Sequence, residues 1–329
     1  MNPLKTIRHY IEYLLVASVM KLVGAAPYSF LRKTARFFAL LLNKLPAVGG
    51  LCRVNIAAAF PEKSKEEVCR IAQKSLENLF LTLLEFLWIR KHPEKLPELV
   101  DLTQVEECAK EGLEKCADGT GVILITPHLG NWEFSGRILA QIYHFPMATI
   151  VRKARNPYLD TLISSGRKGE DSVEIIHSEG AARAMKHALQ AGKSIGILID
   201  QNTKGRDGGI FVNLFGLPVP VSRAPAVLGR KQNHFYAIGT TLRNEDGSFR
   251  AILKKLPREA ASCQTDEELI QLITDETEKL IRLAPEQYLW FYKRFQYIPE
   301  GTPEEVKKRF PPYAKKPSRG FYSNRERGL

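Results

Sequence analysis

Short apolar runs alternate with helix-spaced segments between residues 100 and 202, and this alternation constrains the fold more than any other feature of the sequence. The runs are rich in β-branched residues, which is typical of buried strands. They lie at 121–126, 147–153, 173–177 and 194–202. Because strands that alternate with helices favour a covered parallel sheet, we expect an α/β fold with a mainly parallel central sheet flanked by helices.

Polar side chains follow these runs. In open α/β sheets, functional groups gather beyond the carboxyl ends of the strands. The residues at the four expected ends are His128, Arg152 with Lys153, His177, and Asp200 with Gln201 and Asn202. We therefore expect the functional site at this edge of the sheet.

The stretch LITPHLGNWEFSG sets His128 at the first of these ends and Glu133 five residues later. Pro127 disfavours helical angles in the residue before it, and Asn131 is a good N-cap for a following helix. Side chains five residues apart on one helix point in different directions, but a turn through Gly130 can fold the imidazole back over the first helical turn. We therefore expect His128 and Glu133 to be neighbours.

Such a pair has a chemical interpretation. A neutral imidazole can take a proton from an alcohol while a carboxylate fixes its tautomer, and no serine or cysteine nucleophile is then needed. The alternative is that His128 only caps a turn and Glu133 only complements the helix dipole. The position at a strand end favours the catalytic pair. Since helical zinc motifs need histidines four residues apart, we predict no metal site.

The first fifty residues are both apolar and basic. Their seven basic residues and one acidic residue carry half of the chain's net charge of +12. This combination is typical of attachment to an anionic membrane surface rather than of nucleic-acid binding. Glu12, Lys21 and Pro27 interrupt the apolar stretch that a transmembrane helix requires. We expect residues 1–48 to form membrane-anchoring helices in the interface, with a full span or an ordinary core helix as alternatives.

The rest of the chain divides into one large domain, residues 49–310, and a basic tail, residues 311–329, which we expect to be a loose extension. Ser64 and Glu67 form a capping-box pattern that predicts a long helix from about residue 64 to 90. The five cysteines are scattered and odd in number. They indicate a reducing compartment rather than a disulfide framework.

Five motifs between about residues 50 and 301 resemble those of the late lipid A acyltransferases, the Kdo-dependent lauroyl and myristoyl transferases of the glycerolipid acyltransferase superfamily. In order, they are RVNIAAAFPEKSKEE, HLGNWE, VRKARNPYLDTLISSGR, GILIDQN with FVNLFG, and APEQYLWFYKRF. HLGNWE is similar to the family's His-x4-Asp/Glu catalytic box. The resemblance implies that His128 is the general base and that Glu133 is its orienting partner.

The resemblance also implies the reaction and its setting. A fatty acyl chain would move from an acyl thioester, on acyl carrier protein or coenzyme A, to a hydroxyl of a lipid A precursor. The enzyme would be an O-acyltransferase on the cytoplasmic face of the bacterial inner membrane, without a further cofactor. Transfer to another glycolipid or to a lysophospholipid, or a non-catalytic membrane scaffold, are the alternative functions.

Substrate-binding candidates follow from the same resemblance. Arg167 would hold a phosphate or the phosphopantetheine linker, because a guanidinium can bind either in a bidentate manner. Asp200 and Gln201 would shape the pocket at their strand end. Asn131 and Arg152 are further candidates. The alternatives are a solvated Arg167 and purely structural roles for Asp200 and Gln201.

Overall fold

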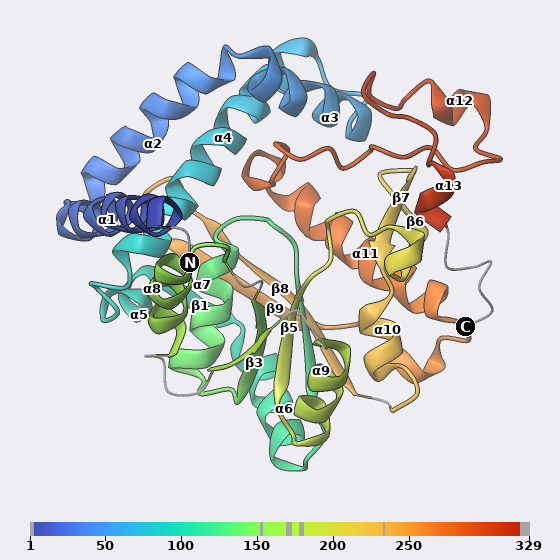
Figure 1. The fold of residues 1–329 in the computed structure, drawn as a ribbon. Coiled ribbons are helices and arrows are strands. Elements are labelled where there is room, and N and C mark those ends of the chain that lie inside the picture. Colours follow the sequence, from blue (N-terminus) through green and yellow to red (C-terminus); the bar gives the residue numbers. More distant parts are fainter. Residues whose placement is uncertain (1–2, 152–153, 169–172, 178–180, 233, 323–329) are drawn as a thin grey trace.

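We describe a computed structural model of the 329-residue chain, which covers residues 3–151, 154–168, 173–177, 181–232 and 234–322. Figure 1 shows a central sheet with helices on both faces, and the N-terminal helices lie across one edge of it. The order of the elements from residue 100 onward follows the alternation of strands and helices that the sequence predicts.

The central sheet has seven strands in the order β1-β9-β8-β2-β5-β3-β4. Five of them are mutually parallel: β2 (Val122–Thr126), β3 (Met147–Val151), β4 (Val173–His177), β5 (Ser194–Leu198) and β8 (Phe235–Arg243). β9 (Phe249–Lys255) runs antiparallel to β8, because a short turn joins the two, and β1 (Val100–Gln104) pairs parallel with β9. The prediction of a mainly parallel sheet flanked by helices is confirmed, and β1 and β9 are its reversed strands.

Both faces of the sheet are buried. Successive side chains of a strand point to opposite faces, so Val122 and Leu124 enter one hydrophobic cluster while Ile123 and Ile125 enter another. The first cluster includes α6 (Glu106–Ala117) and α7 (Trp132–Arg137), which continues as a π-helical turn, Ile138–Ile142. The other includes α9 (Ala181–Gln190), α10 (Ala224–Gly229) and α11 (Asp266–Leu283). This burial explains why the strands lack an alternating polar pattern.

In the described part of the chain, five α-helices precede the sheet: α1 (Pro3–Ala25), α2 (Tyr28–Asn43), α3 (Leu51–Ala59), α4 (Lys65–Trp88) and the short α5 (Lys95–Leu99). α4 begins at the capping box of Ser64 and Glu67, as predicted. α2 packs along α4, and α1 contacts α4 and α8 (Pro157–Lys168).

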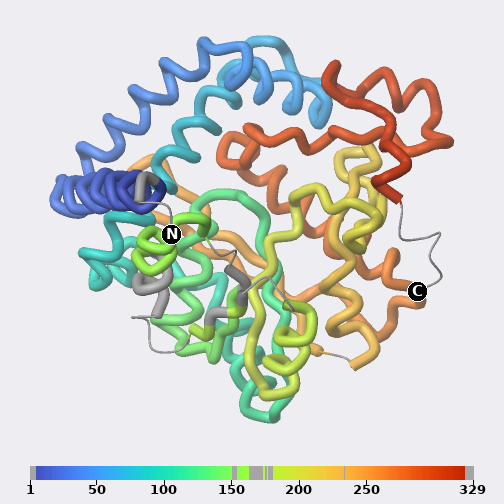
Figure 2. The backbone as a smooth tube through the Cα atoms, in the orientation of Figure 1, coloured from blue at the N-terminus to red at the C-terminus, as the bar shows by residue number. Residues whose placement is uncertain are grey.

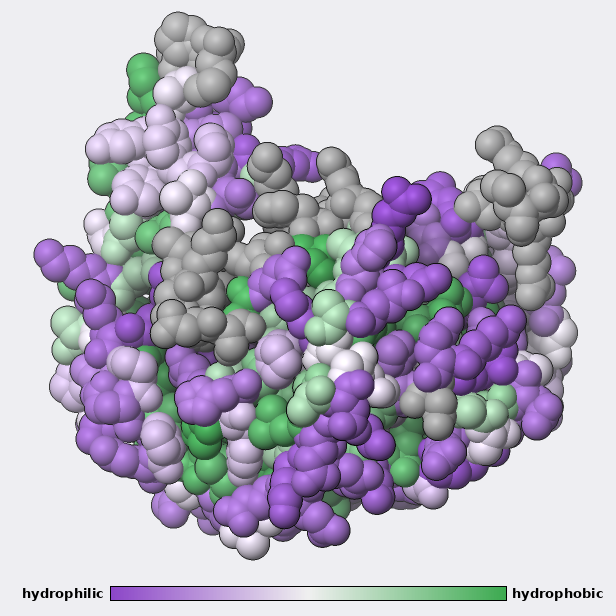
Figure 3. Space-filling model, turned by 90° about the horizontal axis from the view of Figure 1, so that it is seen from below, coloured by the Kyte–Doolittle hydropathy of each residue, from purple (hydrophilic) through white to green (hydrophobic). Residues whose placement is uncertain are grey.

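Apolar side chains on α1 and α2 face outward. The large hydrophobic residues that are exposed there are Ile7, Tyr10, Ile11, Leu14, Leu15, Val16, Val19, Leu22, Phe30, Phe37, Phe38, Leu40 and Leu41. By contrast, the face seen in Figure 3 carries mostly hydrophilic side chains, with hydrophobic ones in small separate areas. Within the described ranges, no single helix is long and apolar enough to cross a membrane. Only α2 combined with Pro46–Ala59, bent by 90°, meets that test. Membrane attachment of residues 1–48 stays a prediction.

The C-terminal segment packs against the domain. After a hairpin of β6 (Gly209–Leu214) and β7 (Leu217–Ser222), α11 and a short α12 (Glu304–Lys307), the chain returns past α3 (Figure 2). Phe321, in α13 (Arg319–Tyr322), is buried, and its ring lies 4.7 Å from that of Tyr297 at a tilt of 51°. Tyr297 also forms an isolated parallel β-bridge with Lys315. Residues 311–322 are therefore not the loose extension that we expected, because their aromatic side chains find apolar partners.

Candidate active site

His128 lies in the turn between β2 and α7, at the carboxyl edge of the sheet, as the sequence predicts. The turn depends on Gly130, which has a φ of +62°, and a Cβ there would lie 2.1 Å from the carbonyl oxygen of Thr241. Only glycine fits both conditions. The backbone N–H of Gly130 donates to Gln287, and that of Asn131 donates to Thr241. These two hydrogen bonds fix the turn directly after His128, and with it the position of the histidine.

Asp200 binds His128 with both carboxylate oxygens. The imidazole Nδ1 lies 2.7 Å from Oδ1, and the backbone N–H of His128 donates to Oδ2 over 2.8 Å. Because a carboxylate can only accept, Nδ1 carries the proton and Nε2 is the free basic nitrogen. Asp200 follows β5, the neighbour of β2 in the sheet. Parallel neighbours end at one edge, which brings the two residues together.

The electrostatics of the pair favour its charged form. Burial alone lowers the pKa of His128, but the charge and hydrogen bond of Asp200, with the charge of Glu133, raise it above its usual value. Burial raises the pKa of Asp200. The charge of His128, its two hydrogen bonds and the charge of Arg294 outweigh burial, so the pKa lies below its usual value. The carboxylate is thus ionised and can stabilise an imidazolium.

Glu133 lies in the first turn of α7, as predicted, but it does not make the predicted contact with the imidazole of His128. In the described part of the chain, no hydrogen bond joins Glu133 to His128. Its charge raises the pKa of His128 less than the charge of Asp200 does. The contact to Nδ1 comes instead from a residue 72 positions away in the sequence. The strand-end position of Asp200 was the signal that could have identified it.

Asn131 has a structural position. It is the N-cap of α7, as predicted, and its Oδ1 accepts from the backbone N–H of Phe134 over 3.0 Å. Its Nδ2 donates to Glu85 over 2.7 Å, and the residue is fully buried. Both polar atoms of its side chain are therefore bound inside the protein, and the contact of Asn131 with substrate stays a prediction.

The exposed side of the imidazole faces Gln201 and Trp132. The side-chain nitrogen of Gln201 lies 3.4 Å from Nε2 of His128, and the indole of Trp132 stands edge-on to the imidazole at 5.1 Å. Gln201 is exposed and can reach a bound molecule. Arg152 lies outside the described residues. Arg167 falls within α8, but its side chain is outside the described part of the structure.

Arg294 and Tyr288 interact with Asp200 of the pair. Neither of them was predicted from the sequence as a site residue. Both are buried, and both interact electrostatically with Asp200. Arg294 also donates to the side chain of Asn202 over 2.7 Å, which fixes the segment that follows Asp200. Both residues belong to the APEQYLWFYKRF motif, so this motif surrounds the carboxylate of Asp200 with polar partners.

Two cavities adjoin the end of β2. One, of about 60 Å³, is almost entirely apolar and lies between α7 and strands β2, β8 and β9. The other, of about 200 Å³, opens beside Trp132 and Glu133. Both are lined by Thr126, Gly136, Met147 and Gly196, so they are neighbours. A Cβ at Gly136 would meet no atom within 4 Å, which shows that this glycine faces open space.

The fold and this arrangement define an α/β protein with a histidine–carboxylate pair at the carboxyl edge of a covered parallel sheet. The chain belongs to the bacterial lipid A biosynthesis acyltransferase family, whose family model matches residues 2–297. The family expected from the five motifs is confirmed, and the protein is an O-acyltransferase.

Named relatives agree with this assignment. The lipid A biosynthesis lauroyltransferase of Escherichia coli K12 is 23% identical over 254 residues, which cover 76% of this chain and 79% of that protein. The lipid A biosynthesis palmitoleoyltransferase of the same organism is 24% identical over 257 residues, with the same coverage. A lipid A biosynthesis acyltransferase of Haemophilus influenzae is 20% identical over 261 residues, which cover 76% of each chain.

Proposed function

We propose that this protein transfers a fatty acyl chain from an acyl thioester to a hydroxyl of a lipid A precursor, with His128 as general base. Nε2 takes the proton of the acceptor hydroxyl, and the oxygen attacks the thioester carbonyl. The new ester forms as the C–S bond breaks, and the thiolate leaves with the proton from the imidazolium. The observation that carries the proposal is the buried Asp200, which accepts the hydrogen bond of Nδ1–H and leaves Nε2 free.

The acyl chain of the donor would occupy the two neighbouring cavities. The first is almost entirely apolar, and both lie at Thr126, the end of β2, two residues before His128, so the thioester carbonyl would lie near the imidazole. Burial of each methylene in such a pocket is worth roughly 0.8 kcal/mol, which suits a fatty chain. Acyl carrier protein and coenzyme A are the two donors that we propose, since both present the same phosphopantetheine thioester.

The acceptor would approach the open side of the imidazole. Gln201 lies close enough to Nε2 to bind a sugar hydroxyl there. We keep Arg167 and Arg152 as proposed ligands of phosphate or of the phosphopantetheine linker. The family and the names of the relatives support a lipid A precursor as acceptor.

The N-terminal helices would hold the enzyme at the cytoplasmic face of the bacterial inner membrane. Their exposed apolar side chains stand beside Lys33 and Arg36, which are also exposed. Apolar burial and attraction to anionic lipid would act together at such a surface. This placement brings a lipid acceptor to the same end of the sheet as His128, because α2 and α4 lie over that edge (Figure 1).

The test is the transfer of a labelled acyl chain by the full-length protein and its His128→Ala variant. Donors are acyl carrier protein and coenzyme A thioesters, and acceptors are a lipid A precursor and a lysophospholipid. We expect transfer to the lipid A precursor and a loss of roughly 10² to 10⁴ in the variant. The matched control is His187→Ala, an exposed histidine of α9, which should keep the full rate. Transfer to the lysophospholipid alone, or equal rates for wild type and His128→Ala, would reject the proposal.

A further inference from the structure

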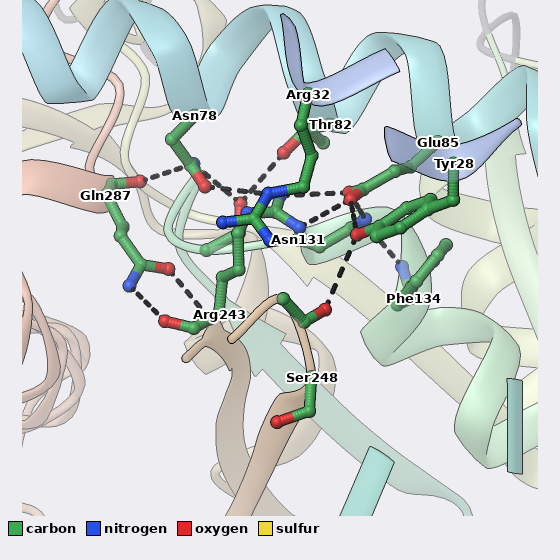
Figure 4. A network of polar contacts seen from close by, with 12 residues as sticks. Tyr28, Arg32, Asn78, Thr82, Glu85, Asn131, Phe134, Arg243, Ser248 and Gln287 are labelled. Carbon is green, nitrogen blue, oxygen red and sulfur yellow. Dashed lines mark hydrogen bonds and ion pairs between the residues drawn. The ribbon is translucent and has the colours of Figure 1, made fainter. Parts of the chain in front are cut away.

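One face of α4 binds the turn that carries His128. Asn78, Thr82 and Glu85 occupy successive turns of this helix and are all buried. Asn78 Nδ2 and Thr82 Oγ1 both donate to the carbonyl oxygen of Gly130, over 3.0 and 3.1 Å. Glu85 accepts from the side chain of Asn131 over 2.7 Å. Two consecutive residues of the turn are therefore held by a single helix face (Figure 4).

Glu85 is the centre of this polar network. Its carboxylate is fully buried and receives two N–H groups of Arg243, one to each oxygen, with Nη2 at 2.9 Å from Oε2. An ionised group without partners would be costly at this depth, so the bidentate pair with Arg243 explains how it is tolerated. Arg243 ends β8, and its backbone N–H and C=O both bind the side chain of Gln287. The network thus joins α4, the end of β8 and the turn.

The same carboxylate also binds the first residue of α2. The hydroxyl of Tyr28 donates to Oε1 of Glu85 over 2.5 Å. Burial, followed by the charge of Glu85, raises the pKa of Tyr28 well above its usual value, so this hydroxyl remains a donor. Four residues later, Arg32 donates to the backbone carbonyls of Glu245 and Asp246 in the turn after β8. Helix α2 is therefore bound to the same carboxylate that binds Asn131.

The turn is short, which makes this fixation relevant to the histidine. Only Pro127, His128, Leu129, Gly130 and Asn131 separate β2 from α7. Asp200 holds the turn from the end of β5, and the face of α4 holds it from the opposite side. Because misplacement of a catalytic group by about 1 Å can cost roughly 10²-fold in rate, loss of either support should be visible in kcat.

We propose that Glu85 is a positioning residue for His128, which it holds through Asn131 while it fixes α2 to the same network through Tyr28. The proposal rests on the proposed function for its kinetic consequence, but the restraint on the turn does not. It assigns a role in the reaction to a residue outside the five motifs, and it makes the docking of α2 part of the geometry of the site.

The experiment compares Glu85→Gln with Glu276→Gln in the full chain. Glu276 is the matched control, because it is a buried carboxylate of α11 paired with Lys254 and Lys279, away from the turn. For Glu85→Gln we expect kcat to fall roughly 10- to 100-fold with KM changed less than about 3-fold. Amide hydrogen exchange in residues 129–135 should rise by roughly 10-fold or more. The control should show neither change.

A milder pair keeps the test decisive if Glu85→Gln does not fold. Thr82→Val removes only the hydrogen bond to Gly130 and keeps the side-chain shape. Its control is Thr274→Val, because Thr274 is a buried threonine of α11 whose hydroxyl donates to the carbonyl oxygen of Ile270 in the same helix. We expect roughly a 3- to 10-fold loss in kcat for Thr82→Val, with faster exchange in residues 129–135, and no such loss for the control.

The outcomes separate this inference from the proposed function. Equal kinetics and equal exchange in the α4 variants and their controls would overturn the positioning role, whatever the reaction is. If wild-type protein transferred no acyl chain while exchange in residues 129–135 still rose in Glu85→Gln, the proposed function would fail and the restraint on the turn would stand. A Tyr28→Phe variant with unchanged exchange in residues 129–135 would remove α2 from the network.

Discussion

Replacement of Asp200 by asparagine tests the geometry of the pair most directly. In the wild type, one oxygen of Asp200 accepts from Nδ1 of His128 and the other from the backbone N–H of the same residue. An asparagine has one oxygen for these two donors. If that oxygen keeps the backbone N–H, its amino group faces Nδ1, which must then lose its proton to Nε2. The base would be in the wrong tautomer.

The size of the effect follows from these two contacts. A hydrogen bond to an ionised group contributes roughly 1.5–3 kcal/mol, which is about 10- to 150-fold in rate. The inverted tautomer adds to this loss, so we expect kcat of Asp200→Asn to fall by roughly 10² to 10⁴. The same change lowers the pKa of His128, because the charge of Asp200 raises that pKa against the effect of burial. Since the neutral imidazole is the active form, the acidic limb of the pH–rate profile should move to lower pH.

Initial rates of labelled acyl transfer, measured across pH with saturating substrates, report both effects. Asp207→Asn is the matched control, because Asp207 is an exposed carboxylate in the loop after the same strand. Glu133→Gln gives the direct comparison with the pair that the sequence predicted, and we expect it to cost less than Asp200→Asn. The reasoning would be refuted if Asp200→Asn kept its rate within about 3-fold and its pH profile, or if only Glu133→Gln gave the large loss.

Three further predictions concern the cavity, the membrane surface and the turn. Gly136→Leu should narrow the two cavities that Gly136 lines and lower transfer of the longest accepted chain by roughly 10-fold while shorter chains are retained, as competition between thioesters of different lengths will show. Lys33→Gln with Arg36→Gln should weaken binding to anionic vesicles by roughly 1 kcal/mol per charge, and high salt should abolish the difference. Gly130→Ala should destabilise the fold by at least about 1–2 kcal/mol, seen as a lower Tm, because of its positive φ and the contact with Thr241. An unchanged chain-length preference would contradict the first prediction, an unchanged vesicle affinity the second, and an unchanged Tm the third.

Several features of the fold were predictable because local forces decide them. The strand at 121–126 is a continuous apolar run, and burial on both faces leaves it no other pattern. The start of α4 at Ser64 and the cap of α7 at Asn131 depend on side chains within three residues of the helix start. The reversal of β9 was not predicted, since the strands after residue 202 were not assigned.

The sequence by itself determined the type of sheet, the edge at which His128 lies and the family of the enzyme, since strand periodicity, turn chemistry and motif order are all local in the chain. Only the tertiary structure decided which carboxylate holds the imidazole. Glu133 and Asp200 are both near strand or helix ends, and the choice between them depends on β5 pairing next to β2, a contact between residues 72 positions apart. The same holds for Asn131, whose hydrogen bond to the buried Glu85 of α4 depends on the packing of that helix against the turn. Pairing of strands and packing of helices are settled by the whole core at once, and no short stretch of sequence contains that information.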